Sequence, residues 1–251
     1  MNQQPAPETS IKYPRRVFTR KMLKYGIRTA AALLFNLKIT GKENLPKGGP
    51  LIVIANHFNW ADPTLMIAGL PWTTEFIGGA RMPWAPQYLT FLVEMYRTLP
   101  VYRGTVSRQS LVLAESVLKQ NGVLGIFPEG GSWADILRPP RPGTALLAVR
   151  TKARILPVGL NNVAEIFPAF KNGKRATVEM RFGPVFGPYD LTPEKMRDRD
   201  TLDELGHDMM RHVADLLPPE KRGWYSNDPA LHAAGVEAAR YPFADNPDLA
   251  Q

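Results

Sequence analysis

Residues 51–63 have the sequence LIVIANHFNWADP, in which an apolar run leads directly into polar groups. The six residues from Leu51 carry no charge and are mostly aliphatic or β-branched, which is typical of a strand buried on both faces. The expected strand ends at Asn56 and His57. Because α/β sheets keep their ligand sites at the carboxyl ends of strands, His57 is a candidate functional residue.

Asp62 follows His57 by five residues and precedes Pro63, a pair that is typical of a helix start with the aspartate at the N-cap. A tight strand–loop–helix connection can return the Asp62 carboxylate to one nitrogen of the His57 ring. The other nitrogen can then take a proton from a hydroxyl, which is the base-and-orienter half of a catalytic triad. The alternative is structural: Asp62 only caps the helix, and His57 is a loop residue satisfied by local hydrogen bonds.

Strand and helix patterns alternate along the rest of the chain. Apolar or alternating segments predict strands at residues 37–41, 74–78, 123–127, 155–160 and 176–182. Amphipathic segments predict helices at residues 63–70, 110–121, 142–151 and 202–217. This alternation predicts the α/β class: a single three-layer domain with a mostly parallel mixed sheet covered by helices on both faces. A length of 251 residues suits one such domain with appendages.

Four segments are expected along the chain. They are a disordered N-terminus (1–11), a basic amphipathic helical segment (12–37), the α/β domain (38–218) and a C-terminal tail (219–251). The stretch at residues 82–93 is uncharged and aromatic. It has two open interpretations, a core helix or a wall that faces an acyl chain or lipid.

All of the net charge of +8 lies in the first 42 residues. That segment holds nine of the 31 Lys and Arg and one of the 23 Asp and Glu, which leaves 22 of each sign in the remainder. A positive field this local attracts a polyanionic surface, either nucleic acid or anionic lipid. Nucleic acid is disfavoured, because residues 43–251 are neutral and contain no recognition motif.

Anionic lipid is favoured by the apolar residues that accompany this charge. Helical spacing puts Phe18, Met22 and Tyr25 on one face, and a basic stripe on another: Arg16, Arg20, Lys24 and Arg28. The longest uncharged stretch of the segment, residues 29–37, is nine residues long, against about 20 for a membrane span. We therefore expect no transmembrane helix, but a peripheral or monotopic protein at the cytoplasmic face of the cell membrane. A helix docked on its own domain and a cleaved targeting peptide remain as alternatives.

Three further segments carry candidate site residues. Phe127-Pro128-Glu129-Gly130 ends a second buried strand, so Glu129 is expected at the same sheet edge as His57, with Gly130 and Gly131 allowing close approach of a ligand. Arg103 follows a short extended run and suits bidentate phosphate binding. The apolar residues 156–158 would shape a pocket.

In order and spacing these segments resemble the glycerolipid acyltransferases of the lysophosphatidate/glycerol-3-phosphate acyltransferase superfamily. Members carry an Asn-His-x4-Asp block, a block ending in Arg, a Phe-Pro-Glu-Gly block and a Val-Pro-type block, and the resemblance covers about residues 38–185. It implies transfer of a fatty acyl group from acyl-CoA or acyl carrier protein to the hydroxyl of a glycerol-phosphate lipid, 1-acyl-glycerol-3-phosphate, in phospholipid synthesis. It implies no metal or cofactor. The absence of cysteine also fits direct transfer without a thiolate nucleophile.

The resemblance also implies roles for individual residues. His57 would be the general base and Asp62 its orienter, while Arg103, Glu129 and Gly130 would hold the acceptor. The substrate-binding block would further include Phe127, Pro128 and Arg141, the last in place of a Lys usual before Gly143. Where the family commonly has Ser two residues after the His and Thr-Arg after Phe-Pro-Glu-Gly, this chain has Asn59 and Gly131-Ser132-Trp133. These departures imply altered recognition of the acceptor.

Three alternatives stay open. The chain could use another lysolipid acceptor, or it could be a non-catalytic anionic-lipid-binding protein on the same fold. Residues 130–134 approach the nucleophile elbow of α/β-hydrolases, with Ser132 as nucleophile. That third interpretation needs a late histidine, which leaves His207, His212 or His232.

Overall fold

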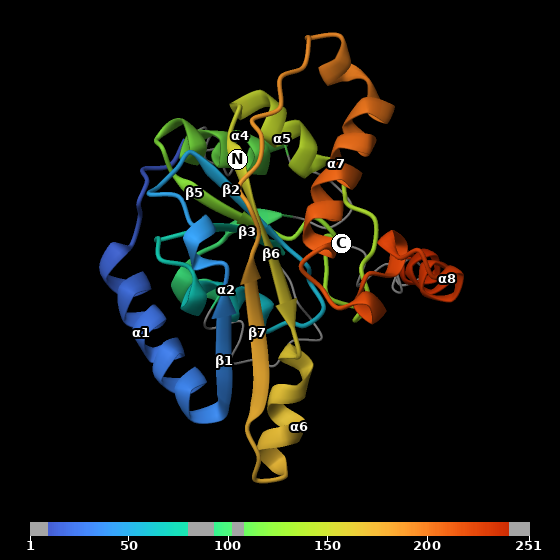
Figure 1. Ribbon diagram of the computed structural model, residues 1–251. Helices are drawn as coiled ribbons and strands as arrows, with labels where there is room; N and C mark the ends of the chain where they lie inside the picture. Colours follow the sequence, from blue (N-terminus) through green and yellow to red (C-terminus); the bar gives the residue numbers. More distant parts are fainter. Residues whose placement is uncertain (1–9, 80–92, 102–107, 241–251) are drawn as a thin grey trace, which may run out of the picture.

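The computed structural model describes residues 10–79, 93–101 and 108–240, and within these ranges the fold centres on one seven-stranded sheet (Figure 1). The strands are β1 (Phe35–Thr40), β2 (Leu51–Ala55), β3 (Glu75–Gly79), β4 (Leu99–Val101), β5 (Val123–Ile126), β6 (Arg154–Asn161) and β7 (Ala176–Phe182). Their order across the sheet is β1-β7-β6-β2-β5-β3-β4. Neighbouring strands run parallel except β6 and β7, which are antiparallel, so the predicted mostly parallel mixed sheet is confirmed.

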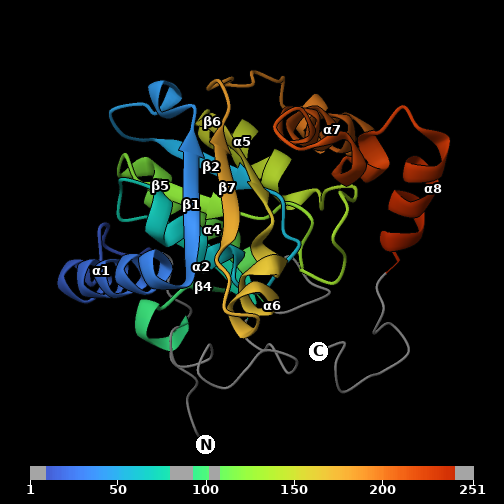
Figure 2. The same ribbon diagram turned by 60° about the horizontal axis from the view of Figure 1, so that its bottom comes forward.

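Helices cover both faces of the sheet. The α-helices are α1 (Val17–Leu34), α2 (Asp62–Gly69), α4 (Arg108–Lys119), α5 (Gly143–Thr151), α6 (Ile166–Lys171), α7 (Arg199–Ala214) and α8 (Pro229–Ala238). Short 3₁₀ turns are η1 (Lys42–Asn44), η2 (Val163–Glu165), η3 (Lys195–Arg197), η4 (Pro219–Lys221) and η5 (Gly223–Tyr225). One hydrophobic core joins the sheet to α4, α5 and α7, and the other joins it to α1, α2 and α6 (Figure 2). The three-layer α/β prediction is therefore confirmed.

The central strand β2 lies between β5 and β6, and none of its five side chains is exposed. This burial explains the unbroken apolar run that the sequence shows there. The register pairs Ile54 with Ile126 of β5 and with Pro157 of β6. The segments that follow β2 and β5 therefore leave the sheet side by side at its carboxyl edge.

The C-terminal segment packs against the loop that follows β5. The backbone N–H of Trp224 donates to the carbonyl of Leu137 at 3.0 Å, and the indole Nε1 of Trp133 donates to the carbonyl of Ala238 at 2.9 Å. A Cβ atom at Gly235 would lie only 2.2 Å from the backbone nitrogen of Trp224, so the close approach of α8 to η5 requires glycine. Residues 219–240 thus form a brace for this loop, while 241–251 lie outside the described residues.

Helix α1 lies along one side of the domain, where its basic stripe faces inward. The side chain of Arg20 is buried and forms a bidentate ion pair with buried Glu75, with N–O distances of 2.5 and 2.7 Å. The other members of the stripe donate to backbone carbonyls: Arg16 to Met95, Lys24 to Leu70 and Arg28 to Ala68. Helix α1 is therefore docked on its own domain, the alternative noted above, and a buried carboxylate and backbone carbonyls accept hydrogen bonds from this stripe.

The outward face of α1 is apolar instead. Its exposed fractions are 78% for Phe18, 58% for Met22, 64% for Tyr25 and 71% for Leu33. Within the described ranges, no helix combines the length and the apolar character that crossing a membrane requires. Ile11, at the end of the segment expected to be disordered, packs on the core and donates its backbone N–H to Ser116 Oγ. Residues 1–9 and most of the aromatic stretch, residues 82–92, lie outside the described residues.

Candidate active site

Asn56 ends β2 by pairing with the backbone of the neighbouring strand. Its side-chain Nδ2 donates to the carbonyl of Leu160 at 2.9 Å, and its Oδ1 accepts the Leu160 backbone N–H at 2.7 Å. The amide thus imitates one more ladder pair where β2 leaves the sheet. This fixed end point holds the backbone of His57 at the carboxyl edge.

His57 and Asp62 lie in direct contact. Nδ1 of His57 is 3.0 Å from Oδ2 of Asp62, and the same carboxylate oxygen accepts the backbone N–H of Asn59 at 2.7 Å. A carboxylate can only accept, so Nδ1 carries the ring proton and Nε2 is left as the acceptor. The imidazole is 15% exposed, whereas the Asp62 side chain is 1% exposed. The predicted orientation of one ring nitrogen by Asp62 is present in the structure.

Asp62 does not cap the helix that it begins. It is the first residue of α2, the N-cap position belongs to Ala61, and no side chain caps that end. The turn is held by Asn59, whose Oδ1 accepts the Ala61 N–H at 3.0 Å. The predicted N-cap role of Asp62 is wrong, because its carboxylate turns back to the imidazole. Its second oxygen, Oδ1, is buried without a hydrogen-bond partner in the described part of the chain.

Glu129 holds the backbone of His57 from the neighbouring strand end. Its Oε1 accepts the His57 N–H at 2.6 Å, and its Oε2 accepts Nε of Arg138 at 3.0 Å and the Arg138 N–H at 3.2 Å. Nη2 of Arg138 in turn donates to the carbonyl of His57 at 3.2 Å and to the carbonyl of Gly131. Both backbone polar groups of His57 are therefore fixed by one buried ion pair.

This pair is deeply buried, and each side chain is about 1% exposed. Burial raises the pKa of Glu129 to about 7, against the opposing effects of Arg138 and of the backbone N–H donors. Because both oxygens of Glu129 contact protein groups, the side chain has no exposed atom for a ligand. The expectation that Glu129 itself holds the acceptor is not supported; its contacts are those of a positioning residue.

The remaining residues of the Phe-Pro-Glu-Gly block surround the imidazole. The ring of Phe127 stacks on His57 with a centroid distance of 4.2 Å. Gly130 has φ of +78°, which favours glycine, and a Cβ there would lie 3.1 Å from Cγ of Arg141. The Arg141 backbone N–H donates to the carbonyl of Pro128 at 2.7 Å, while its side chain is exposed. Arg141 is therefore placed beside this block as predicted, whereas Arg103 lies outside the described residues.

A family model described as Acyltransferase matches residues 36–161, half of the chain, and these residues contain His57, Asp62 and Glu129. The chain belongs to this acyltransferase family. Among curated proteins, the 1-acyl-sn-glycerol-3-phosphate acyltransferase of Bacillus subtilis is 23% identical over 155 residues, covering 61% of this chain and 77% of that protein. The protein of the same name from Borreliella burgdorferi is 28% identical over 135 residues, covering 51% of this chain and 52% of that protein.

The solved structure of PlsC from Thermotoga maritima, a 1-acyl-sn-glycerophosphate (LPA) acyltransferase, has the same fold. Its TM-score is 0.57 at 20% sequence identity, and the match covers 82% of the present acyltransferase and 84% of that chain. The predicted glycerolipid acyltransferase superfamily is thus confirmed, and the chain is an acyltransferase.

Arg138 is the site residue of this acyltransferase that the sequence alone did not reveal. No basic residue directly follows Gly130. The buried guanidinium belongs to Arg138, in the loop after β5 that packs against the brace. Its Cζ also lies 4.0 Å from the ring centre of Trp133. One signal was available: an acidic residue at the end of a buried strand needs a cation, and Arg138 and Arg141 are the next ones in the sequence.

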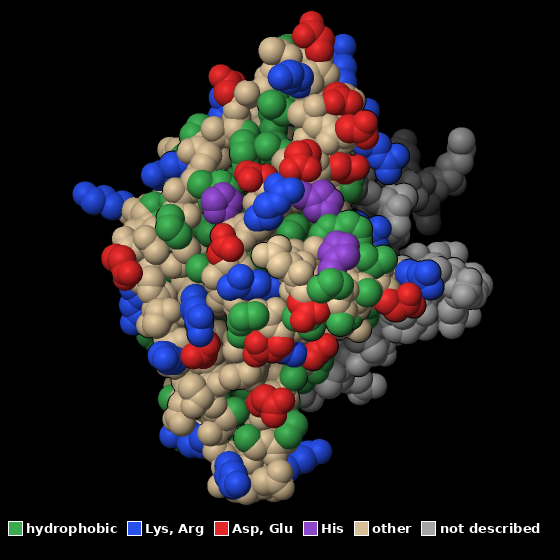
Figure 3. Space-filling model, turned by 45° about the vertical axis from the view of Figure 1, so that its right-hand side comes forward, with side chains coloured by type: hydrophobic (Ala, Val, Ile, Leu, Met, Phe, Trp, Pro, Cys, Tyr) green, Lys and Arg blue, Asp and Glu red, His purple; other side chains and the backbone are tan. Residues whose placement is uncertain are grey.

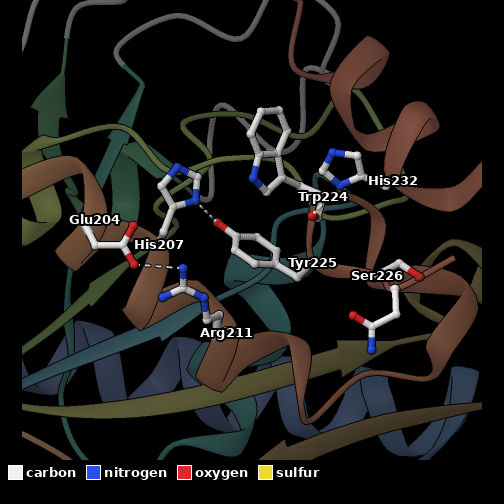
Figure 4. A pocket seen from close by; sticks show the side chains of 8 residues that line it. Glu204, His207, Arg211, Trp224, Tyr225, Ser226 and His232 are labelled. Atoms are coloured by element: carbon white, nitrogen blue, oxygen red, sulfur yellow. Dashed lines mark hydrogen bonds and ion pairs between the residues drawn. The ribbon is translucent and has the colours of Figure 1, made fainter. Parts of the chain in front are cut away.

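A cavity of about 550 Å³ lies between α7 and the brace, and its lining includes His207 and His232 but not His57, Asp62 or Glu129 (Figure 4). There Nδ1 of His207 is 2.9 Å from the Tyr225 hydroxyl, and Arg211 pairs with Glu204 at 2.8 Å. Histidine side chains on this face of the molecule stand among charged and apolar ones (Figure 3). Because His207 contacts Tyr225 rather than Ser132, its geometry does not support the hydrolase interpretation.

Proposed function

We propose that this acyltransferase moves a fatty acyl group from a thioester to the free hydroxyl of 1-acyl-glycerol-3-phosphate. The observation that carries the proposal is the His57–Asp62 pair at the carboxyl end of β2, within a matched acyltransferase domain. The names of both curated relatives support this choice of acceptor. The donor is acyl-CoA or acyl carrier protein.

In the proposed reaction, Nε2 of His57 removes the proton from the acceptor hydroxyl as the oxygen attacks the thioester carbonyl. Asp62 stabilises the imidazolium that forms, because its carboxylate accepts a hydrogen bond from Nδ1–H and keeps its negative charge. A carbon–oxygen bond forms, the carbon–sulfur bond breaks, and His57 returns the proton to the departing thiolate. No covalent acyl-enzyme is needed, so the mechanism requires no nucleophilic side chain.

The surrounding residues position this base and bind the acceptor. The Glu129–Arg138 pair fixes the backbone of His57, and stacking on Phe127 limits rotation of the ring. For the acceptor phosphate we propose Arg141 together with Arg103. Gly130 presents backbone instead of a side chain beside Arg141, which leaves room for a headgroup.

We also propose that the enzyme works on a membrane surface. The apolar face of α1 is exposed, and Phe167 and Phe170 of α6 are 39% and 53% exposed. Both views place α6 and the C-terminal end of α1 at the end of the sheet where β6 stops (Figures 1 and 2). Trp60, from the loop between His57 and Asp62, stacks on Phe167 at 5.5 Å. An apolar surface that reaches the active-site loop suits an acceptor that arrives from lipid.

Acyl transfer to lysophosphatidate tests the proposal. The full chain is incubated with acyl-CoA or acyl carrier protein thioester and vesicles that contain lysophosphatidate, and phosphatidate is measured by mass spectrometry. We expect phosphatidate from the wild-type chain and at least about 10²-fold less from the His57→Ala variant. An exposed-residue control, Lys119→Ala, should leave turnover unchanged. Equal turnover in His57→Ala and the wild type would contradict the proposed base.

A second acceptor class is favoured by one observation. The basic residue that the family commonly places after the Gly of Phe-Pro-Glu-Gly is absent, and its substitute, Arg138, is buried against Glu129. Lysophosphatidylcholine and lysophosphatidylglycerol should therefore be offered beside lysophosphatidate. A higher kcat/KM for either one would assign the enzyme to that acceptor. Product from none of them would contradict the proposed class of acceptor.

A further inference from the structure

A cavity of about 310 Å³ lies between α1 and the connection from α2 to β3. Its walls include three basic side chains of α1, Lys21, Lys24 and Arg28, together with the rings of Tyr25 and Trp72. The basic residues follow one another at spacings of three and four, so they lie on one side of the helix. Among the described residues that line the cavity, none is acidic.

Among the residues that the structure describes, no carboxylate forms an ion pair with any of these three side chains. Arg20, which also lines the cavity, is neutralised by its bidentate pair with Glu75. Within the described ranges, Lys24 donates to the carbonyl of Leu70 and Arg28 to that of Ala68, and both retain N–H groups beyond those bonds. Lys21 is exposed and has no hydrogen-bond or ion-pair partner in the described part of the chain.

The pKa of Lys24 lies below its ordinary value. Burial is the larger cause and the positive charge of Arg28 the smaller one, and together they lower the pKa to about 8. An anion between the two side chains would reverse the second effect and stabilise the protonated amine. The cavity is therefore electrostatically suited to a ligand of negative charge.

We infer that this cavity is a binding site for a phosphate ester, held by Lys21, Lys24 and Arg28. Lysine and arginine N–H groups form charge-assisted hydrogen bonds with phosphate oxygens. Tyr25 belongs to both the cavity and the exposed apolar face of α1, so the acyl chains of a phospholipid could leave the cavity along Met22 and Phe18. An anionic lipid headgroup and a free phosphate compound share this chemistry, and the experiment below separates them.

The site is distinct from the active site. Helix α2 contacts His57 through Asp62 at its first residue, whereas it borders the cavity through Ile67 in its last turn. These two positions are about 7.5 Å apart along the helix axis, and the other side of the cavity is the segment that enters β3 at the opposite edge of the sheet. A lipid bound here is therefore not the acceptor that His57 would deprotonate. Binding of a lipid headgroup at this site depends on the proposed membrane contact of α1, whereas binding of a soluble phosphate compound does not.

Vesicle binding by the full chain tests the lipid source. Binding to phosphatidylcholine vesicles with and without phosphatidylglycerol is compared for the wild type, Lys21→Gln/Lys24→Gln and the charge-matched control Lys47→Gln/Lys119→Gln. We expect the cavity pair to lose about tenfold in binding to the anionic vesicles and the control pair to change less than about twofold. Equal losses in both pairs would overturn the lipid source, because they would indicate only the overall charge. Lys21→Gln alone, at an exposed position, repeats the test without risk to the fold.

Trp72 provides the test for a free phosphate compound. Titration with inorganic phosphate or glycerol-3-phosphate should change tryptophan fluorescence with saturation in the wild type, and not in Trp72→Phe or Lys21→Gln/Lys24→Gln. Saturation by the soluble phosphate with equal vesicle binding in the cavity and control pairs would assign the site to a free phosphate. Saturation in neither assay would refute the site. Acyl transfer to a short-chain soluble lysophosphatidate, measured in parallel, should be unchanged in the cavity pair, so failure of the proposed function is seen separately.

Discussion

Oδ2 of Asp62 lies 3.0 Å from Nδ1 of His57 and accepts the backbone N–H of Asn59 at the same time. One oxygen thus fixes both the imidazole and the turn that carries it. The second oxygen is buried without a hydrogen-bond partner in the described part of the chain, which costs desolvation free energy. This cost is not expected for an aspartate with a purely structural role. The arrangement suits a carboxylate that stabilises a transient imidazolium.

Asp62→Asn should therefore lower kcat by about 10²–10⁴-fold. The amide can donate its N–H to Nδ1, which favours the tautomer whose Nε2 is protonated and cannot act as a base. KM for the acceptor should change little, because Asp62 is buried away from the ligand. Steady-state acyl transfer by the variant, with circular dichroism as a check on folding, measures the effect. A kcat within about twofold of the wild type would remove the orienting role.

Arg138→Met should cost about 3–5 kcal/mol of unfolding free energy, because it leaves Glu129 buried without its cation. Urea unfolding followed by circular dichroism gives this value, with Arg154→Met at an exposed position of β6 as control. The double variant Glu129→Gln/Arg138→Met should recover part of the stability but little activity. Recovery of full turnover by the double variant would show that the pair does not position His57.

The fold was largely predictable because most of its strands and helices are visible in the sequence, either as an apolar run or as apolar residues at the period of a strand or helix. The expected strand at residues 176–182 matches β7 residue for residue, and β2 follows directly from its run of uncharged residues. The short helix α6 and helix α8 were not predicted. Packing against the rest of the domain, rather than a long apolar periodicity, determines where these short helices form.

The site was predictable only in part, for a different reason. His57 and Asp62 are five residues apart, so a local turn decides their contact and local sequence reveals it. The inward direction of the α1 basic stripe depends on Glu75, which lies 55 positions from Arg20. Arg138 likewise reaches His57 across 81 positions. Contacts at such separations follow from the assembled sheet, so the sequence indicates at most that a buried acid needs a cation, and not which cation reaches it.

Stability should fall as the pH rises from about 5 to 8, through Glu129. Its pKa is about 7 in the folded protein against an ordinary value of 4.5, so the folded state binds more protons in this window. The stabilisation is complete below the ordinary value and is lost as the pH rises past about 7, on the order of 3 kcal/mol. Glu129→Gln has no such group, so its unfolding free energy should change less over this range. Parallel urea titrations of both proteins at several pH values measure the difference, and identical slopes would contradict the raised pKa.

Arg20→Met should destabilise the attachment of α1. Of the two ion-pair partners of Glu75 in the described residues, the substitution leaves Arg15, and breaking such a buried pair costs about 3–5 kcal/mol. Hydrogen exchange should show α1 opening more often while β2 and β5 keep their protection. Arg199→Met, at a side chain that is 87% exposed, should change stability by less than about 0.5 kcal/mol. Deletion of the N-terminal helix is a poor test of membrane binding for the same reason, since it would remove the partners of Glu75.

The apolar face of α1 should instead be tested by substitution at its surface. Phe18→Ser/Met22→Gln/Tyr25→Ser should lower partitioning onto vesicles by at least about 10²-fold, since each large apolar side chain gains about 1.5–3 kcal/mol on full burial. The three side chains are exposed, so the folded domain and its turnover on a soluble short-chain acceptor should be retained. Val236→Ser, on exposed α8, provides the control. Sedimentation with neutral vesicles measures the contribution of these apolar side chains to binding without the contribution of charge. Unchanged partitioning of the triple variant would place the membrane contact elsewhere, with Phe167 and Phe170 of α6 as the next residues to replace.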